Sequence, residues 1–433
     1  MKTNRNSSSH LHSKALVLGM MAGLAIAVMP RFASAASADV ENLYKEGMYL
    51  RESGKLYSAI EALEATLAAE PTLQRVRLEL AVAYYRALNY ERAQVEARKV
   101  LDDPKTPDNV KLAVSTFLAQ LKKDEEMSLG QRSVFEPFFS AGLIHDSNVN
   151  AGPDGGAVLP GGLVLAPGST SQEDWGMQLQ GAISHTYQSP TPMRFGETAA
   201  RFQWKSQASL FHRGYFDLSD YDLTVATLAT GPAWIAPNKW RANINLQADY
   251  LMLGGNELAW YQSVAPSFTW QTTSGEVTAD VLYVKRDFSR TGDQGRDSDY
   301  TSGGVSYGHL FQGGKVAGQV GVKYFNEEAD DNQYSNDGYE WFVGANFQAW
   351  TNGTVHVRYS QKEANYDGLV PVFGVARDET EQRVEIGFGH KFVEGKLKGW
   401  YLSGSLQLTD NQSNVSIYDY QRNMTTLTLS RSF

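Results

Sequence analysis

The chain has 433 residues, a formal net charge of −9 and no cysteine. Without cysteine it forms neither disulfides nor thiol-based metal or redox sites, and it lacks the cysteine that a lipid anchor requires. Its acidic balance argues against nucleic-acid binding, which needs clustered Lys and Arg side chains.

The first residues have the pattern of a secretory signal peptide. A basic start, Lys2 to Lys14, precedes an apolar run from Ala15 to Met29, and Ala33–Ala35 and Ala36–Ala38 both match a cleavage site. We predict a signal peptide over residues 1–38. Its removal takes away four basic residues and no acidic residue, so the formal net charge of the mature chain is −9 − 4 = −13. No apolar run reaches the roughly 18 residues of a spanning helix, so any membrane crossing must use strands.

Residues 39–130 have helical spacing and an internal repeat of about 34 residues, the tetratricopeptide period. In the first repeat Gly47, Ala59, Leu63 and Pro71 fall where small, small, large and terminating residues are needed. The second repeat has Ala81, Tyr84, Tyr90, Ala93 and Pro104, followed by a capping helix over 109–126. The sequence therefore predicts a small α-helical, tetratricopeptide-like domain.

Arrays of this kind bind proteins or peptides along a concave groove. Repeat position predicts four cargo-binding candidates on that groove, Tyr44, Met48, Arg51 and Tyr85. Ordinary packing between repeats is the alternative for the two tyrosines.

From Phe135 onward the apolar period changes to two. In Trp240 to Tyr250 the even positions are apolar with an aromatic residue at each end, and the odd positions are polar or charged. Segments 354–360, 383–388 and 400–409 repeat this alternation. In an outer-membrane barrel the apolar face meets lipid and the terminal aromatics lie at the two interfaces.

The spacing of turns also indicates a barrel. Short turns are expected at 190–192, 236–238, 312–314, 352–353 and 394–395, and longer loops at 290–297, 330–338 and 366–378. Residues 134–433 hold about 14 antiparallel strands, and an even number returns both barrel ends to the periplasm. Phe433 ends an alternating last strand and is predicted to serve barrel assembly. A soluble all-β protein would leave the signal peptide, the turns and Phe433 unexplained.

The predicted inner face carries charges of both signs. Lumen-facing candidates are Arg241, Asp249, Arg358, Arg383 and Glu385. A simple ion pore tends towards one sign, so a mixed lining suits transient contacts with a polypeptide, or equally a plugged lumen.

No segment predicts catalysis, a cofactor site or a metal site. His145, Asp146 and Ser147 are residue types of a hydrolytic site, but neighbours on a strand point to opposite faces. The Gly- and Pro-rich stretch 152–168 precedes no helix, so it is predicted to be a surface loop rather than a phosphate cradle.

The segment Phe138–Asn150, which ends in Asp-Ser-Asn-Val-Asn, resembles the opening of the barrel domain in the surface lipoprotein assembly modifier (Slam) family. These proteins are outer-membrane translocators of type XI secretion, and the order of signal peptide, helical repeats and barrel resembles them too. The resemblance implies an outer-membrane location and export of a protein cargo, either a surface lipoprotein or a soluble secreted protein. The helical domain would receive the cargo in the periplasm.

The partners expected on this interpretation are the cargo, the outer membrane and the barrel assembly machinery, and the chain is expected to be a monomer. The helical region is brief, which leaves open whether it handles the cargo of longer members. An exopolysaccharide export barrel and a substrate-specific porin are the alternatives.

Overall fold

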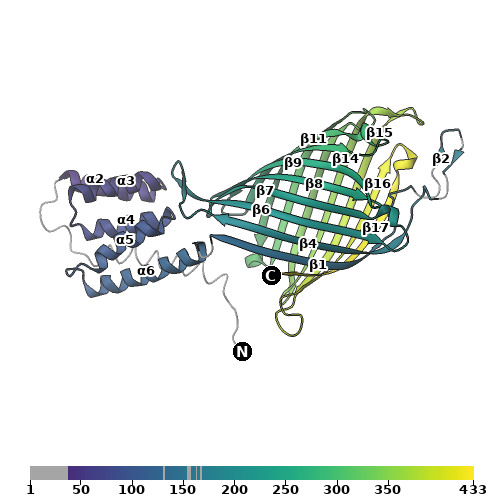
Figure 1. Ribbon diagram of the computed structural model, residues 1–433. Coiled ribbons are helices and arrows are strands. Elements are labelled where there is room, and N and C mark those ends of the chain that lie inside the picture. Colours follow the sequence, from purple (N-terminus) through teal and green to yellow (C-terminus); the bar gives the residue numbers. More distant parts are fainter. Residues whose placement is uncertain (1–37, 130–131, 154–157, 162, 166–167) are drawn as a thin grey trace. The chain divides into compact units, whose positions relative to one another are not determined.

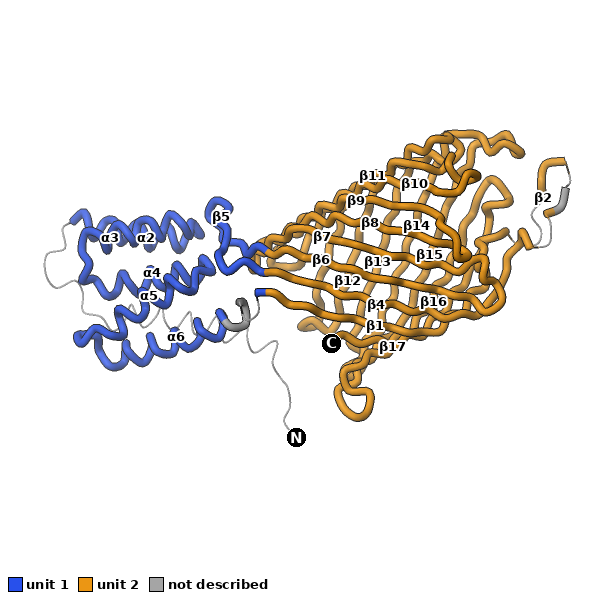
Figure 2. The backbone as a smooth tube through the Cα atoms, in the orientation of Figure 1, with its two compact units in different colours: residues 1–132, 188–202 blue, residues 133–187, 203–433 orange. Residues whose placement is uncertain are grey.

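The computed structural model describes residues 38–129, 132–153, 158–161, 163–165 and 168–433 (Figure 1). All but the last residue of the predicted signal peptide lies outside these residues. The chain forms two compact units (Figure 2). The first, here called the helical unit, comprises the chain up to residue 132 together with 188–202, and the second is the barrel, residues 133–187 and 203–433.

Five helices make up most of the described part of the helical unit. They are α2 (Ala38–Glu52), α3 (Leu56–Ala69), α4 (Gln74–Arg86), α5 (Tyr90–Leu101) and α6 (Asp108–Leu129). Consecutive helices pack on one another around a buried core that includes Leu63, Val76 and Leu121. Small residues allow the close approach, since a Cβ at Gly47 would lie 3.0 Å from the Leu63 side chain.

The helical unit also contains a segment that is distant in sequence. Residues 188–202 hold the short strand β5 (Met193–Phe195) and the beginning of β6 (Thr198–Tyr215). Ala199 belongs to the same buried core as the helices. The chain therefore passes between the two units three times, after residues 132, 187 and 202.

In the described residues, fourteen long strands form a closed antiparallel barrel, in which each pairs with its sequence neighbours and β1 pairs with β17. The predicted fold class, a barrel of about this size after a helical region, is confirmed. The strands besides β6 are β1 (Ser133–Asp146), β4 (Asp174–Gln188), β7 (Leu223–Ala236), β8 (Trp240–Leu253), β9 (Asn256–Gln271), β10 (Glu276–Phe288), β11 (Ser298–Phe311), β12 (Val316–Ala329), β13 (Asn336–Trp350), β14 (Gly353–Val370), β15 (Val375–Lys391), β16 (Tyr401–Ser413) and β17 (Tyr420–Ser432).

Short elements lie in the connections. They are β2 (Val158–Leu159), β3 (Leu163–Val164) and the single-turn helices η1 (Ser219–Tyr221), η2 (Gln294–Arg296), η3 (Gln312–Gly314) and η4 (Ser416–Tyr418).

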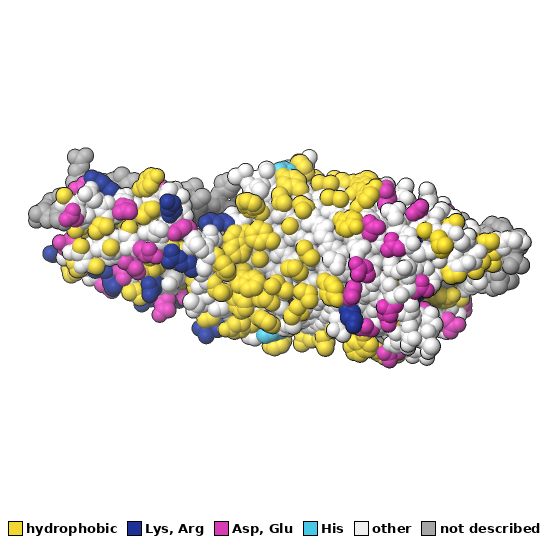
Figure 3. Space-filling model, turned by 90° about the horizontal axis from the view of Figure 1, so that it is seen from above, with side chains coloured by type: hydrophobic (Ala, Val, Ile, Leu, Met, Phe, Trp, Pro, Cys, Tyr) yellow, Lys and Arg dark blue, Asp and Glu magenta, His cyan; other side chains and the backbone are white. Residues whose placement is uncertain are grey.

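The outer face of the barrel is apolar. Ile244 and Leu246 on β8 are exposed, and hydrophobic side chains gather into a belt with acidic side chains beyond one edge (Figure 3). Aromatic side chains pair across β8 and β9 near both strand ends, Trp240 with Trp270 and Tyr250 with Trp260. Only helices and closed barrels satisfy their backbone hydrogen bonds in hydrocarbon, and a belt with aromatic borders is the lipid-facing surface of such a barrel. The chain is an outer-membrane β-barrel.

None of the described helices has both the length and the apolar character that crossing a bilayer demands.

The strand connections correct two expectations. The turn predicted to be short at 394–395 is part of a longer connection, residues 392–400 between β15 and β16. β14 runs to Val370 and β15 begins at Val375, so the long loop predicted at 366–378 is wrong and residues 371–374 make the turn. The reason lies near the end of β14, where the ladder with β15 is irregular between Asn365 and Leu369 and the polar pair Asp367 and Gly368 interrupts the apolar positions. The alternation that identifies a strand is lost there.

Candidate functional site

The charged side chains on the inner face of the barrel are held by neighbouring side chains. Arg241 on β8 donates to Glu276 on β10 at 2.9 Å. Asp249 accepts hydrogen bonds from Thr227 on β7 at 2.6 Å and from Gln247 at 2.8 Å. Both predicted residues alternate with the exposed Ile244 and Leu246 and therefore lie on the opposite, inner face.

The remaining lumen candidates lie on β14 and β15. Arg383 donates to Glu381 at 2.8 Å, and Glu385 lies 3.0 Å from His356. The Arg358 guanidinium stacks on the Phe342 ring, 3.8 Å from its centroid. Such a stack restricts the guanidinium and leaves its edge available for hydrogen bonds. The five residues thus lie in two separate parts of the inner face, β8 and β14–β15, and their contact with a transported substrate stays a prediction.

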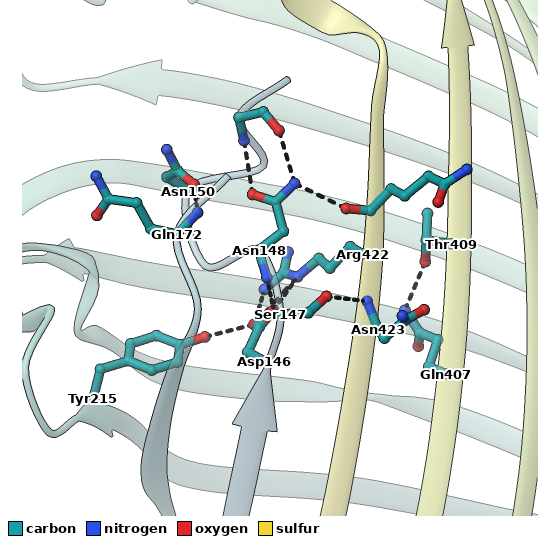
Figure 4. A network of polar contacts seen from close by, with 12 residues as sticks. Asp146, Ser147, Asn148, Asn150, Gln172, Tyr215, Gln407, Thr409, Arg422 and Asn423 are labelled. Atoms are coloured by element: carbon teal, nitrogen blue, oxygen red, sulfur yellow. Dashed lines mark hydrogen bonds and ion pairs between the residues drawn. The ribbon is translucent and has the colours of Figure 1, made fainter. Parts of the chain in front are cut away.

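The polar residues of the Asp-Ser-Asn-Val-Asn element, at the loop end of β1, make hydrogen bonds to other strands and to the following loop (Figure 4). The Asp146 carboxylate, 0% exposed, accepts hydrogen bonds from Arg422 on β17 at 2.9 and 3.2 Å. It also accepts one from the Tyr215 hydroxyl of β6 at 2.9 Å. A Cβ at Gly176, on the intervening strand β4, would lie 2.3 Å from the Gly214 carbonyl oxygen. Asp146 thus ties the first strand to the last and to β6.

The next three polar residues extend this contact to the loop that follows β1. Ser147 accepts a hydrogen bond from the Asn423 N–H at 2.8 Å and donates its own N–H to the Asn423 carbonyl oxygen. The buried Asn148 amide donates to the carbonyl oxygens of Gly152 and Gln421. Asn150 donates to Thr170 at 2.8 Å and accepts from the Gln172 N–H.

We call these residues, together with Arg422 and Tyr215, the seam cluster, because it fixes the line where β1 and β17 close the barrel. The sequence singled out the motif but not its partners Arg422 and Tyr215. The feature of the sequence that could have identified Arg422 as a partner is an arginine at an inner-face position of the last strand.

The same region shows why its residue types do not form a hydrolytic site. His145 points to the other face of β1, where it lies 2.9 Å from Glu173 and beside the Trp175 ring. Asp146 and Ser147 are engaged in the seam cluster. In the residues that the structure describes, no three His, Cys, Asp or Glu side chains are grouped to hold a metal ion.

The four cargo-binding candidates take part in helix packing. Tyr44 is 7% exposed and Met48 packs against the core. Arg51 pairs with Glu79, both nearly buried. The Tyr85 ring packs against Phe117 at 5.7 Å and its hydroxyl donates to Asp124. Burial and the bond to Asp124 raise the pKa of Tyr85. For Tyr44 and Tyr85 these contacts are those of ordinary packing between repeats, and cargo binding by the four residues stays a prediction.

Sequence reasoning missed the role of residues 188–202. The Glu197 carboxylate accepts the backbone N–H groups of Tyr57 and Ser58, at 2.7 and 3.2 Å, and the Ser58 hydroxyl at 2.8 Å. Arg194 pairs with Glu61 at 2.9 Å. Partial burial acts to raise the pKa of Glu197, but the three hydrogen bonds hold it below its ordinary value. The predicted short turn at 190–192 thus belongs to a segment that caps α3.

The terminal residue lies next to the first strand. The Phe433 N–H donates to the Pro137 carbonyl oxygen at 2.9 Å, and the side chain is 65% exposed beside Arg431. Its role in barrel assembly stays a prediction.

No protein-family model and no curated protein matches the sequence. Among solved structures the chain is similar to a loop L8 deletion mutant of OmpT, an outer membrane protein of Vibrio cholerae. The TM-score is 0.40 with 8% identity, over 70% of this chain and 100% of that chain. Pseudomonas aeruginosa OprD gives a TM-score of 0.37 with 8% identity, over 70% of this chain and 95% of that chain. Acinetobacter baumannii OccAB3 gives a TM-score of 0.35 with 12% identity, over 70% of this chain and 99% of that chain. No functional conclusion follows from likeness of this degree.

Proposed function

We propose that this outer-membrane barrel is a translocator that delivers a specific protein cargo to the cell surface, with the helical unit receiving the cargo in the periplasm. The observation that carries the proposal is the construction of the helical unit. Five helices and the segment 188–202, which joins β4 to β6, share one core. Because short turns of such barrels face the periplasm, a unit built on one of them belongs there as well.

This construction supports a role in transport rather than simple tethering. A domain on a single linker moves independently of its neighbour. Here the chain enters or leaves the helical unit three times, and Glu197 and Arg194 attach the β4–β6 connection to α3. The segment that joins β4 to β6 is therefore part of the unit that would receive the cargo.

Two further observations agree with a polypeptide cargo. The inner wall offers both signs of charge, as a polypeptide does, through residues such as Arg241 and Asp249. The resemblance of Phe138–Asn150 to the Slam family points to the same class of function. We infer that the seam cluster keeps β1 and β17 joined while cargo passes.

A substrate-specific porin is the second candidate, and the inner wall gives the observation that favours it. Some of its charges are held in pairs, as Arg383 is with Glu381, and the Arg358 guanidinium lies over the Phe342 ring. A rigid wall of this kind suits recognition of one small polar solute. On that interpretation the helical unit would serve periplasmic scaffolding.

One comparison separates the two candidates. Cells with and without the gene are treated with external protease, and the released peptides are identified by mass spectrometry. We expect one or a few proteins to lose surface exposure without the gene and to regain it with the full chain. Removal of residues 39–126 should leave the barrel at normal abundance and strongly reduce delivery. An unchanged set of surface proteins, with liposomes of purified full chain swelling in amino acids or sugars, would instead support the porin.

A further inference from the structure

The helical unit has an open cleft that none of the four predicted groove residues lines. It has a volume of about 750 Å³ and is bounded by the α4–α5 connection, the outward side of α5, Glu125 of α6 and the turn 190–192. We call it the α5 cleft. All of these parts belong to the helical unit. Since Tyr44 and Arg51 are occupied in packing, this cleft is a surface on which the helices can receive another chain.

The α5 cleft has apolar contact surface on both sides. Val95 on α5 is 47% exposed, an apolar side chain on the outward side of a helix. Leu88, in the connection, has a φ of 60°, which is rare for a residue with a side chain of this size. Pro190 and Pro192 form the opposite edge. Because prolines fix their backbone in advance, this edge loses little entropy when it makes contact.

The charges of the α5 cleft are mostly acidic. It is lined by Glu64, Glu91, Glu96 and Glu125 against Arg92 and Arg132, which sums to −2. Two of the acids already have cationic partners, because Glu64 lies 3.5 Å from Arg92 and Glu96 lies 2.8 Å from Arg77. In the part of the chain that the structure describes, no cation pairs with Glu91 or Glu125, and Glu125 accepts a bond only from the Gln94 amide.

One aromatic residue on the cleft wall is fixed in place. Tyr84 donates its hydroxyl to Glu64, and the Arg92 guanidinium lies over its ring at 5.5 Å. Burial and the bond to Glu64 raise the pKa of Tyr84 to about 12, so the hydroxyl stays protonated as a donor at neutral pH. Arg92 is thereby turned towards Tyr84 and Glu64, which leaves the acidic side of the cleft to a ligand.

We infer that the α5 cleft binds an extended peptide segment that places an apolar side chain against Val95 and Leu88 and a Lys or Arg beside Glu91 and Glu125. The apolar contact supplies affinity, and the two carboxylates select the charge of the segment. The inference rests on the proposed function, in that the segment belongs to the cargo.

The full-length protein in a neutral detergent tests this assignment by fluorescence anisotropy. The probe is the dye-labelled heptapeptide Ser-Gly-Lys-Leu-Lys-Gly-Ser, compared with the same peptide carrying Glu in place of Lys. We expect saturable binding of the basic peptide alone. The double variant Glu91→Gln with Glu125→Gln should weaken it about fivefold, the effect of losing two exposed ion pairs. Val95→Ser should weaken it by a similar factor.

The matched control is Glu46→Gln with Glu52→Gln, the same change of charge at exposed positions of α2. Equal weakening by the control, equal binding of the acidic peptide or no saturable binding would overturn the inference. The peptide assay involves no transport, so its failure is distinguishable from that of the proposed function. If the peptide binds as expected but surface proteins are unchanged without the gene, the cleft stands and the proposed function falls.

Discussion

The barrel and the helical unit differ in what fixes a side chain's surroundings. In the barrel a continuous antiparallel register assigns alternate residues to alternate faces, so Ile244 is exposed while Asn245 faces inward. In the helical unit the repeat positions predicted to face a groove, Tyr44 and Tyr85, lie among packed helices. The Glu197 carboxylate accepts a hydrogen bond from Tyr57, which is 140 residues away in the sequence. The two faces of a strand in lipid can be predicted from its own sequence, because one face always meets the same medium. The surroundings of a helix residue depend on which other segments pack against that helix.

The largest expected effect tests the packing of the helical unit. Tyr44→Ala with Tyr85→Ala should destabilise this unit by about 3–5 kcal/mol at the buried Tyr44, the cost of removing a large buried side chain, and by less at the partly buried Tyr85. Hydrogen exchange of α2 and α4 in the full chain measures it, with Tyr44→Phe and Tyr85→Phe as controls that keep the rings. Delivery of cargo should fall in parallel. If hydrogen exchange of α2 and α4 is unchanged while delivery of cargo is lost, these tyrosines bind cargo and are not needed for packing.

The next effect tests the seam cluster. Arg422→Met leaves the Asp146 carboxylate buried without its cation and should destabilise the barrel by about 3–5 kcal/mol. The control is Arg241→Met, whose ion pair with Glu276 is much more exposed and should cost no more than about 1 kcal/mol. Urea unfolding of the refolded barrel in detergent compares them, and Asp146→Asn should rescue part of the loss. Equal effects of the two arginine variants would show that the seam cluster contributes no special stability.

A single-residue step tests the faces of β8. Ile244→Arg puts a cation into hydrocarbon at a cost of about 2–4 kcal/mol. Asn245→Arg lies on the inner face and should be nearly neutral. The same unfolding assay measures both, and a more damaging Asn245→Arg would mean that the register of this strand is shifted by one residue.

The smallest effect tests the capping of α3 by residues 188–202. Glu197→Gln should cost about 1 kcal/mol of local stability, the effect of losing a charged cap. It should appear as faster hydrogen exchange over 56–69. The control is Glu61→Gln, whose exposed pair with Arg194 contributes little.

The same cap predicts a dependence on pH. The pKa of Glu197 is lowered in the folded chain from an ordinary value of 4.5. Its contribution is therefore complete above about pH 4.5 and is lost as pH falls through the folded pKa. Exchange over 56–69, corrected for intrinsic rates, should match between wild type and Glu197→Gln only in acid. A wild-type chain that loses this protection between pH 8 and 6 would contradict the assignment.

The sequence predicted the barrel well where lipid enforces alternation and poorly where it does not. Trp240 to Tyr250 shows its faces directly, because one side must be apolar along the whole span. Near the end of β14 the ladder is irregular between Asn365 and Leu369, and Asp367 and Gly368 give that part of the strand the composition of a loop. The seam motif was visible as a string of polar residues, but its partners Arg422 and Tyr215 lie on other strands.

By itself the sequence determined the fold class, the approximate number of strands and the two faces of the clearest segments, such as Trp240 to Tyr250. Those properties follow from local alternation against one medium. Only the tertiary structure decided that Glu197 caps α3, that Asp146 closes the barrel with Arg422 and that Glu125 and the turn 190–192 line one cleft with α5. Each of these contacts joins residues that are far apart in the chain. Such contacts depend on how whole helices and strands pack, because a stable packing must give every buried polar group a hydrogen-bond partner.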